Sequence, residues 1–141
     1  MLLVLVLSLV AIGCGGGAPL TTPSASQSDS PPLRTDTIAL AELYGLRLVG
    51  TSSSAQMTLP AHIEGPLWGA RRCASANAGF DLRAHAGEHV VVKSQRIAQR
   101  INGLPVTLWT VEKDGVVVGA WFVVSDASMT IVGVRRGANE F

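Results

Sequence analysis

Two histidines and a glutamate stand close together in the segment His85-Ala-Gly-Glu-His89. Spacing of i, i+4 would bring both imidazoles to one side of a helix, where they could bind a metal or exchange protons. Gly87 and the valines after His89 instead predict a turn that enters a strand. A zinc site also needs three or four ligands, and His62 is the only other histidine. We therefore expect solvated turn residues here, with no metal and no cofactor.

Cysteine, serine and aspartate offer the other candidates for a nucleophile or a base. Cys73 lies on the apolar face of an expected helix and is interpreted as a small buried hydrophobe. Residues 52–54 are serines without the Gly-x-Ser-x-Gly context of a nucleophile elbow. Asp81 is expected to stabilise the turn after that helix. The sequence therefore assigns no catalytic residue, and a cell-envelope hydrolase that uses the His85/His89 region is the alternative.

Cys14 has the surroundings of a lipidated cysteine. Residues 2–12 form an apolar run that is shorter than the about 20 residues a bilayer core requires, and that has the length of a signal-peptide core. Ala11-Ile12-Gly13-Cys14 follows and resembles a bacterial lipobox. We expect residues 1–13 to be a signal peptide and Cys14 to carry the lipid anchor, with more than one acyl chain for stable attachment. No intramolecular disulfide would then form, because Cys73 is the only other cysteine.

The next segment, residues 14–36, is dominated by glycine, serine, threonine and proline. Such a composition cannot bury enough apolar surface to offset chain entropy, so we expect a disordered tether. Residues 37–141 remain for one small domain. The chain has a net charge of +1 and 15% charged residues, which gives no field strong enough to attract nucleic acid. We expect no nucleic-acid partner.

The elements that must position these residues are organised around a hairpin. Two apolar, β-branched runs between Leu104 and Val124 flank Asp114-Gly115, a dipeptide typical of a type I′ turn. A two-residue turn would place the pairs Val111–Val118, Trp109–Ala120 and Thr107–Phe122 on one face of a sheet, which we assign to the helix layer.

Apolar periodicity predicts helices over 37–46 and from about Gly65 to Ala78, with Pro66 in the first turn and Gly79 after the end. Further strands are expected within 46–59, over 89–97 and over 129–135. Helices separate from an antiparallel meander indicate an α+β, two-layer fold. We expect an antiparallel sheet of about four to five strands with two helices on one face.

The opposite face of this hairpin is the candidate contact surface. It would bear Leu108, Thr110, Trp121 and Val123. An uncovered apolar patch with a tryptophan is a frequent signature of an interface. The alternative is that the N-terminal helix covers this face, since small domains bury the faces of their sheets with helices.

The order of motifs from Tyr44 onward resembles a bacterial domain of unknown function, number 4830. The resemblance covers roughly residues 40–134 and is carried by Tyr44-Gly45, Leu59-Pro60, Gly79-Phe80-Asp81-Leu82 with Gly87, and Asp114-Gly115 with Gly119. It implies a secreted or membrane-anchored bacterial protein and supplies no catalytic residues. The chain departs from the family in a shorter, alanine-rich second helix region that contains Gly65-Pro66.

These observations predict a membrane-anchored extracytoplasmic lipoprotein that displays a small non-catalytic binding or structural domain. Its partners would be the membrane, through the lipid, and a protein or cell-wall component. A stress or sporulation accessory protein is a third option.

Overall fold

The computed structural model describes residues 35–136. The predicted signal peptide, Cys14 and the tether up to residue 34 lie outside the described residues. The elements follow one another as α1 (Thr37–Tyr44), β1 (Leu48–Thr58), α2 (Pro66–Asn77), a short 3-10 helix η1 (Leu82–His85), β2 (His89–Ile101), β3 (Leu104–Lys113), β4 (Val116–Val124) and β5 (Ile131–Gly133).

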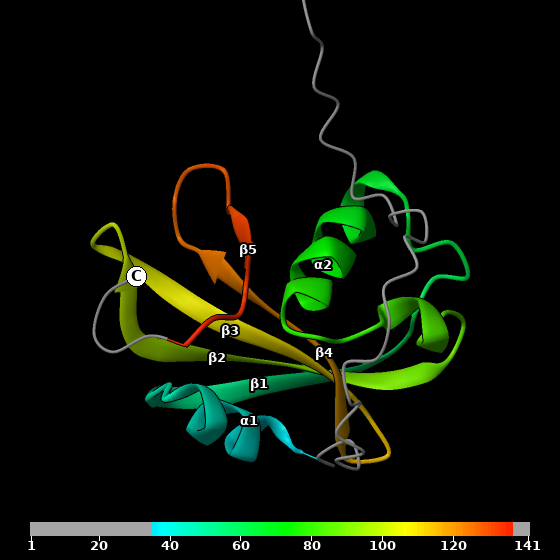
Figure 1. The fold of residues 1–141 in the computed structure, drawn as a ribbon, viewed down its shortest axis with the longest axis horizontal. Helices are drawn as coiled ribbons and strands as arrows, with labels where there is room; N and C mark the ends of the chain where they lie inside the picture. Colours follow the sequence, from blue (N-terminus) through cyan, green and yellow to red (C-terminus); the bar gives the residue numbers. More distant parts are fainter. Residues whose placement is uncertain (1–34, 137–141) are drawn as a thin grey trace, which may run out of the picture.

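The five strands form one antiparallel sheet in the order β1-β2-β3-β4-β5, so each strand pairs with its neighbour in the chain (Figure 1). This confirms the predicted α+β class, the five-stranded antiparallel sheet and the two helices. The segment 46–59, where one strand or two short strands were expected, forms the single strand β1 of 11 residues with an irregularity between Val49 and Ser53. Pairing with β2 keeps this serine-rich segment extended despite its low intrinsic strand preference.

The helix ends follow the signals in the sequence. Asp36 caps α1, since its carboxylate accepts a hydrogen bond of 2.9 Å from the Ala39 N–H. The helix α1 ends at Tyr44, two residues before the expected end, and Gly45 follows it with a φ angle of 66°. Pro66 opens α2 and Gly79 follows it with a φ angle of 86°, as predicted.

The turn between β3 and β4 is the predicted one. Asp114 and Gly115 have φ angles of 51° and 77°, the two positive values that a type I′ turn requires. Lys113 pairs with Val116 across this turn. The sequence therefore encodes the position of the turn locally, in one dipeptide that tolerates left-handed backbone.

A β-bulge at Val118 changes the register beyond the turn. Glu112 pairs with Val117, whereas Val111 pairs with Gly119, so Val118 has no partner of its own on β3. The expected pairs were wrong by one residue. They are replaced by Val111–Gly119, Trp109–Trp121 and Thr107–Val123. Because side chains alternate between faces, this single residue sends the rest of β4 to the opposite face from the one expected.

The bulge gives the sheet two apolar faces, each with its own helix. The first, here the α1 face, packs Leu40 and Ala41 of α1 against Leu108 and Phe122. The second, the α2 face, packs Ala74 and Trp68 of α2 against a group of buried strand residues; that group is Val90, Val92, Val111, Trp121 and Val123.

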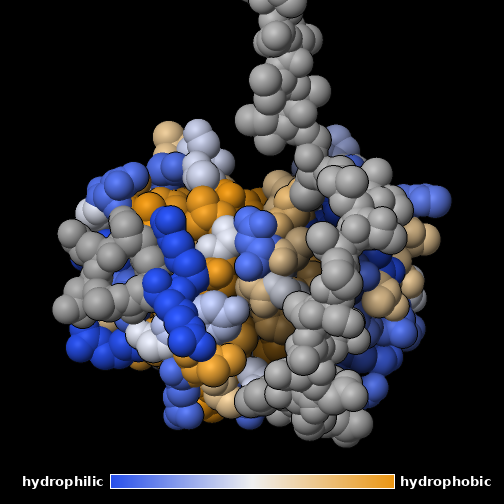
Figure 2. Space-filling model, in the orientation of Figure 1, coloured by the Kyte–Doolittle hydropathy of each residue, from blue (hydrophilic) through white to orange (hydrophobic). Residues whose placement is uncertain are grey.

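The two helices therefore lie on opposite sides of the sheet, and the expectation that both share one face was wrong (Figure 1). The physical reason is the bulge, because apolar residues of β4 on both sides of the sheet need cover. Figure 2 shows that some apolar surface stays visible at the centre of the view, between hydrophilic residues.

Candidate functional site

The best-organised polar site lies where the chain enters the domain from its N-terminal side. The carbonyl of Thr35 accepts a hydrogen bond of 2.8 Å from the Val117 N–H, at the start of β4. β5 pairs with β4 only from Trp121 to Val123, so Thr35 uses a backbone group of β4 that β5 does not reach. Thr35 and Thr37 are 6% and 8% exposed. The entering chain is thus held against the sheet before the first helix begins.

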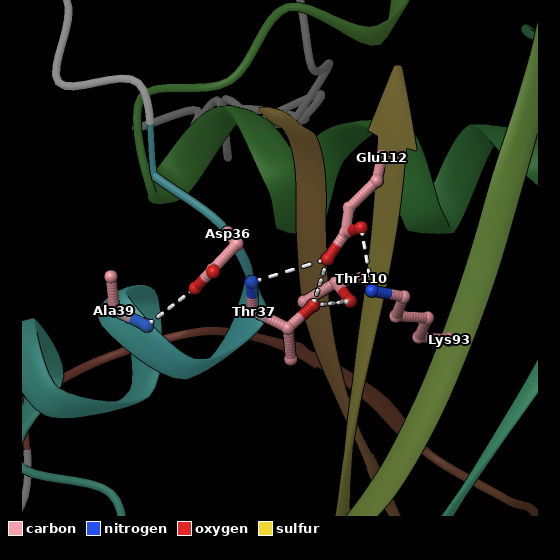
Figure 3. Close-up of polar contacts among 6 residues, drawn as sticks. All are labelled: Asp36, Thr37, Ala39, Lys93, Thr110 and Glu112. Carbon is pink, nitrogen blue, oxygen red and sulfur yellow. Dashed lines mark hydrogen bonds and ion pairs between the residues drawn. The ribbon is translucent and has the colours of Figure 1, made fainter. Parts of the chain in front are cut away.

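Thr37 continues this attachment by bonding to the end of β3 (Figure 3). One carboxylate oxygen of Glu112 accepts from the Thr37 N–H at 3.1 Å and from the Thr37 hydroxyl at 2.6 Å. Thr37 is the first residue of α1, where backbone N–H groups have no partner within the helix. The carboxylate therefore satisfies a free donor and lies at the positive end of the helix dipole.

Thr110 and Lys93 complete the network. The Thr37 and Thr110 hydroxyl oxygens are 2.6 Å apart. The Thr37 hydroxyl has one hydrogen and donates it to the carboxylate, so the Thr110 hydroxyl must donate to the Thr37 oxygen. The Lys93 ammonium lies 2.7 Å from the second oxygen of Glu112. Every strong polar atom around the buried carboxylate then has a partner, which is the condition under which burying a charge is tolerated.

The acidity of Glu112 reflects a balance of opposing effects. Burial raises its pKa, since the charged form loses water. Hydrogen bonds from Lys93 and Thr37, together with the positive charge of Lys93, act in the other direction and outweigh burial. The net result is a pKa below the usual value for glutamate, so the carboxylate is charged in the folded domain.

Sequence reasoning missed this site. Thr37 was recognised only as a residue at the start of a helix, Thr110 was assigned to the candidate contact surface, and Glu112 was given no role. The one usable signal is the alternation in β3, where Thr110 and Glu112 share a face with Leu108 and so must be buried together if that face is covered. Nothing local indicates that residues near position 37 provide the cover.

The predicted contact surface does not exist as one exposed face. Leu108 and Thr110 belong to the α1 face, and Trp121 and Val123 to the α2 face. All four are buried, with exposures of 1%, 0%, 1% and 8%. The alternative, cover by the N-terminal helix, holds for Leu108 and Thr110. The bulge at Val118 accounts for the difference, since it separates two pairs that a regular hairpin would place together.

Trp121 is instead the centre of an aromatic cluster. Trp109 stacks parallel to it at 6.4 Å between ring centroids, and Trp68 of α2 meets it edge-on at 6.2 Å. The Arg71 guanidinium lies over the Trp68 and Trp121 rings, at 5.4 and 5.9 Å. Burial lowers the pKa of Arg71. This cluster fastens α2 to the sheet.

The two histidines of the predicted hydrolase alternative do not converge. The Nδ1 atom of His85 lies 2.8 Å from a carboxylate oxygen of Glu88, and this contact lowers the pKa of Glu88. The Nδ1 atom of His89 lies 2.9 Å from the Thr58 hydroxyl. Asp81 accepts from the Arg83 N–H at 3.0 Å and so stabilises the turn, as predicted.

His85 and Asp81 line an open depression of about 680 Å³, whereas His89 lines a different one of about 370 Å³. Residues lining the first include Phe80, Lys113 and Val118, and no serine, threonine or cysteine is among them. Within residues 35–136, no three histidine, cysteine or acidic side chains are grouped closely enough to hold a metal ion. In this part of the chain, the depression beside His85 therefore contains no hydroxyl or thiol, and the one hydroxyl next to an imidazole is that of Thr58, beside His89 on the other depression.

Cys73 differs from its predicted role as a small buried hydrophobe. It is half-buried on α2 and is disulfide-bonded. The only other cysteine in the sequence, Cys14, lies outside the described residues. This state of Cys73 contradicts the expectation that it forms no disulfide. Lipidation of Cys14 and a disulfide between Cys14 and Cys73 exclude each other, because both use the Cys14 sulfur.

The chain matches no family model, no curated protein and no solved structure. The resemblance to the domain of unknown function 4830 therefore stays a prediction. Among the described residues, no helix is both long and apolar enough to cross a bilayer.

Proposed function

We propose that this protein is an extracytoplasmic lipoprotein, attached to the cell membrane through lipid on Cys14, that displays a non-catalytic binding or structural domain. The observation that carries the proposal is the buried attachment of Thr35 and Thr37 to the ends of β3 and β4. A domain held by a tether needs a fixed point at which the tether leaves it. Hydrogen bonds from two strands supply that point, so a force along the tether acts on the sheet and not on an isolated helix.

The proposed tether has room to separate the domain from the membrane. A glycine- and serine-rich chain spans on average about 5–6 Å times the square root of its residue number, which is roughly 25 Å for the segment 14–34. That distance clears the lipid head groups and leaves the domain close to the surface. The proposed partners are the membrane, through the lipid, and a protein or cell-wall component within this reach.

The arrangement of the histidines supports a binding role over the hydrolase alternative. His85 and His89 belong to separate depressions, and each already has a hydrogen-bonding partner. A hydrolase of the predicted kind requires a nucleophile or an activated water between the imidazoles and a carboxylate. The side chains that line the depression beside His85 include no hydroxyl or thiol nucleophile.

Fractionation of cells that express the full chain tests the anchor. We expect the wild-type protein in the membrane fraction, with a mass increase that corresponds to acyl chains on Cys14. Cys14→Ala should move the protein out of that fraction, whereas the matched control Cys73→Ala should not. Digestion of intact spheroplasts with protease should remove the domain if it faces outward.

Mass spectrometry of peptides prepared without reduction gives an independent test of Cys14. If Cys14 is lipidated, its peptide should carry the mass of the acyl chains and should not be linked to the peptide of Cys73. Recovery of the two cysteines in one disulfide-linked peptide would overturn lipidation of Cys14. Wild-type protein that stays soluble with residues 1–13 intact would overturn the placement as a whole.

A further inference from the structure

The outer edge of β1 is long and uncharged, and no other strand of residues 35–136 pairs with it. β1 has 11 residues, Leu48–Thr58, and forms one border of the sheet. It contains no charged residue and no proline. Its positions from Val49 to Gln56 are all exposed. Proteins usually protect such an edge with lysine, proline, a bulge or a covering segment, because unpaired backbone groups there bind other strands.

Of the features that protect a strand edge, the described residues show one on β1, an irregularity in its first half. The irregularity between Val49 and Ser53 interrupts regular pairing with β2 there. From Ser53 to Thr58 the pairing is regular, residue by residue. This second half is therefore a regular strand segment whose outer side has no strand partner among the described residues.

The direction of the backbone groups follows from the end of the strand. Leu59 donates its N–H to the Glu88 carbonyl at 2.9 Å and accepts from the Gly87 N–H at 3.0 Å, so both of its groups face the β2 side. Alternate residues of a strand face the same neighbour, which assigns Met57 and Ala55 to β2. The backbone N–H and C=O groups of the intervening residues then point outward; these residues are Ser54, Gln56 and Thr58.

We infer that this edge pairs with the same edge of a second copy of the chain, in antiparallel orientation about a two-fold axis at Gln56. The pairs would be Gln56 with Gln56 of the second copy, and Ser54 with its Thr58, in both directions. Each is a pair that exchanges two backbone hydrogen bonds, so all the outward groups of the regular segment are satisfied. A two-fold arrangement of one patch on itself is the commonest form of a homodimer.

The lack of charged residues in β1 favours a second copy as the strand that pairs with this edge. Self-pairing brings identical side chains together, and it is tolerated only where these are uncharged, as they are throughout β1. The opposite border of the sheet, β5, has three residues and is too short to receive β1 in a chain of sheets. Pairing of β1 with β1 therefore stops at a dimer. The borders of the joined sheet are then the two short β5 strands. This inference does not depend on the proposed lipid anchor.

Co-purification of two differently tagged full-length copies, expressed together, tests the pairing. We expect wild-type copies to co-purify. Gln56→Lys in both copies should abolish recovery, because it places two positive charges opposite each other at the axis. Gln56→Glu in both copies should do the same. One copy with Gln56→Lys and the other with Gln56→Glu should restore recovery, which a misfolded variant would not do.

Ala76→Lys on the exposed side of α2 is the matched control and should leave recovery unchanged. Gln56→Pro removes only an outward-facing N–H and should also abolish recovery. Wild-type copies that do not co-purify would overturn the inference. So would recovery that persists with Gln56→Lys, or recovery that the opposite charges fail to restore.

Discussion

The hydroxyl of Thr37 donates to the carboxylate of Glu112 at 2.6 Å, across 75 positions of the chain. This contact joins the first turn of α1 to the end of β3 and is the centre of the network in Figure 3. Glu112 is 5% exposed, so its partners replace the water that the carboxylate loses on folding.

Glu112→Gln should lower the free energy of unfolding by about 1.5–3 kcal/mol, the range for hydrogen bonds to a charged group. The amide can still accept from Thr37, but Lys93 loses its opposite charge. Urea denaturation of the full chain measures the change.

The matched control for this substitution is Glu64→Gln. Glu64 lies 3.1 Å from Arg83, but both side chains are more than half exposed. Exposed ion pairs contribute at most about 1 kcal/mol. If Glu112→Gln costs no more than Glu64→Gln, the network does not hold the entering chain.

The same carboxylate should make the domain sensitive to acid. The pKa of Glu112 is lower in the folded domain than the value of about 4.3 in an unfolded chain. Its contribution to stability is therefore fully present above that value and is lost as the pH falls through the folded pKa. Unfolding free energies of wild type and Glu112→Gln should differ by a constant amount above about pH 5 and converge at lower pH.

Other carboxylates also titrate in this pH range. Their contributions cancel when the unfolding free energy of the variant is subtracted from that of the wild type. A hydrogen bond from Thr130 lowers the pKa of Asp126, and one from His85 lowers that of Glu88. Both groups remain in the variant, so both contribute equally to the two curves. A difference that stays constant to the acid end of the titration would contradict the role assigned to Glu112.

Local signals were enough to predict most elements. Asp114-Gly115 fixes a turn because those two residues tolerate positive φ angles, and Gly79 follows α2 for the same reason. Pro66 suits the start of α2 because its φ angle is already helical and it has no N–H to leave unpaired. The bulge at Val118 has no such signal. It lies in a run of valines, where a strand has no alternation that would show which residue is extra.

The unpredicted bulge residue, Val118, was enough to misplace the candidate contact surface. A shift of one position moves Trp121 and Val123 to the face opposite Leu108, so both the contact surface and the side of the helices were wrong. The network around Glu112 was missed for a different reason, because its partner Thr37 is distant in the chain. Patterns within a window of a few residues contain no information on such pairs.

Gly119 should tolerate no side chain. A Cβ atom at this position would overlap a methyl carbon of Leu82, whose side chain is fully buried. Gly119→Ala therefore forces Leu82 to move and should cost about 1–3 kcal/mol, the usual range for overpacking. Thermal or urea unfolding measures the loss.

A double-mutant cycle shows whether Leu82 is the cause. Leu82→Ala alone should destabilise by opening a cavity, but Gly119→Ala should add little on that background. Costs that simply add would mean that the alanine meets some other obstacle. Gly115→Ala offers a contrast, since no atom lies within 4 Å of its added Cβ and only the φ angle of 77° opposes it.

Trp121→Ala tests whether Trp121 is a residue of the hydrophobic core or of a contact surface. A contact residue on a surface loses binding with little change in stability, whereas truncation of a buried tryptophan costs about 3–5 kcal/mol. We expect the second result, because Trp121 is 1% exposed and lies between Trp68 and Trp109. Leu67→Ala, at an α2 position that is 65% exposed, should stay within about 0.5 kcal/mol of wild type.

Trp121→Phe sharpens this test. The indole N–H of Trp121 is buried and has no acceptor among the described residues, so phenylalanine removes an unsatisfied donor along with part of the ring. The loss should therefore be clearly smaller than that of Trp121→Ala, in unfolding followed by near-ultraviolet circular dichroism. An equal loss would mean that the N–H has a partner. A Trp121→Ala protein as stable as Leu67→Ala would mean that the cluster does not fasten α2 to the sheet.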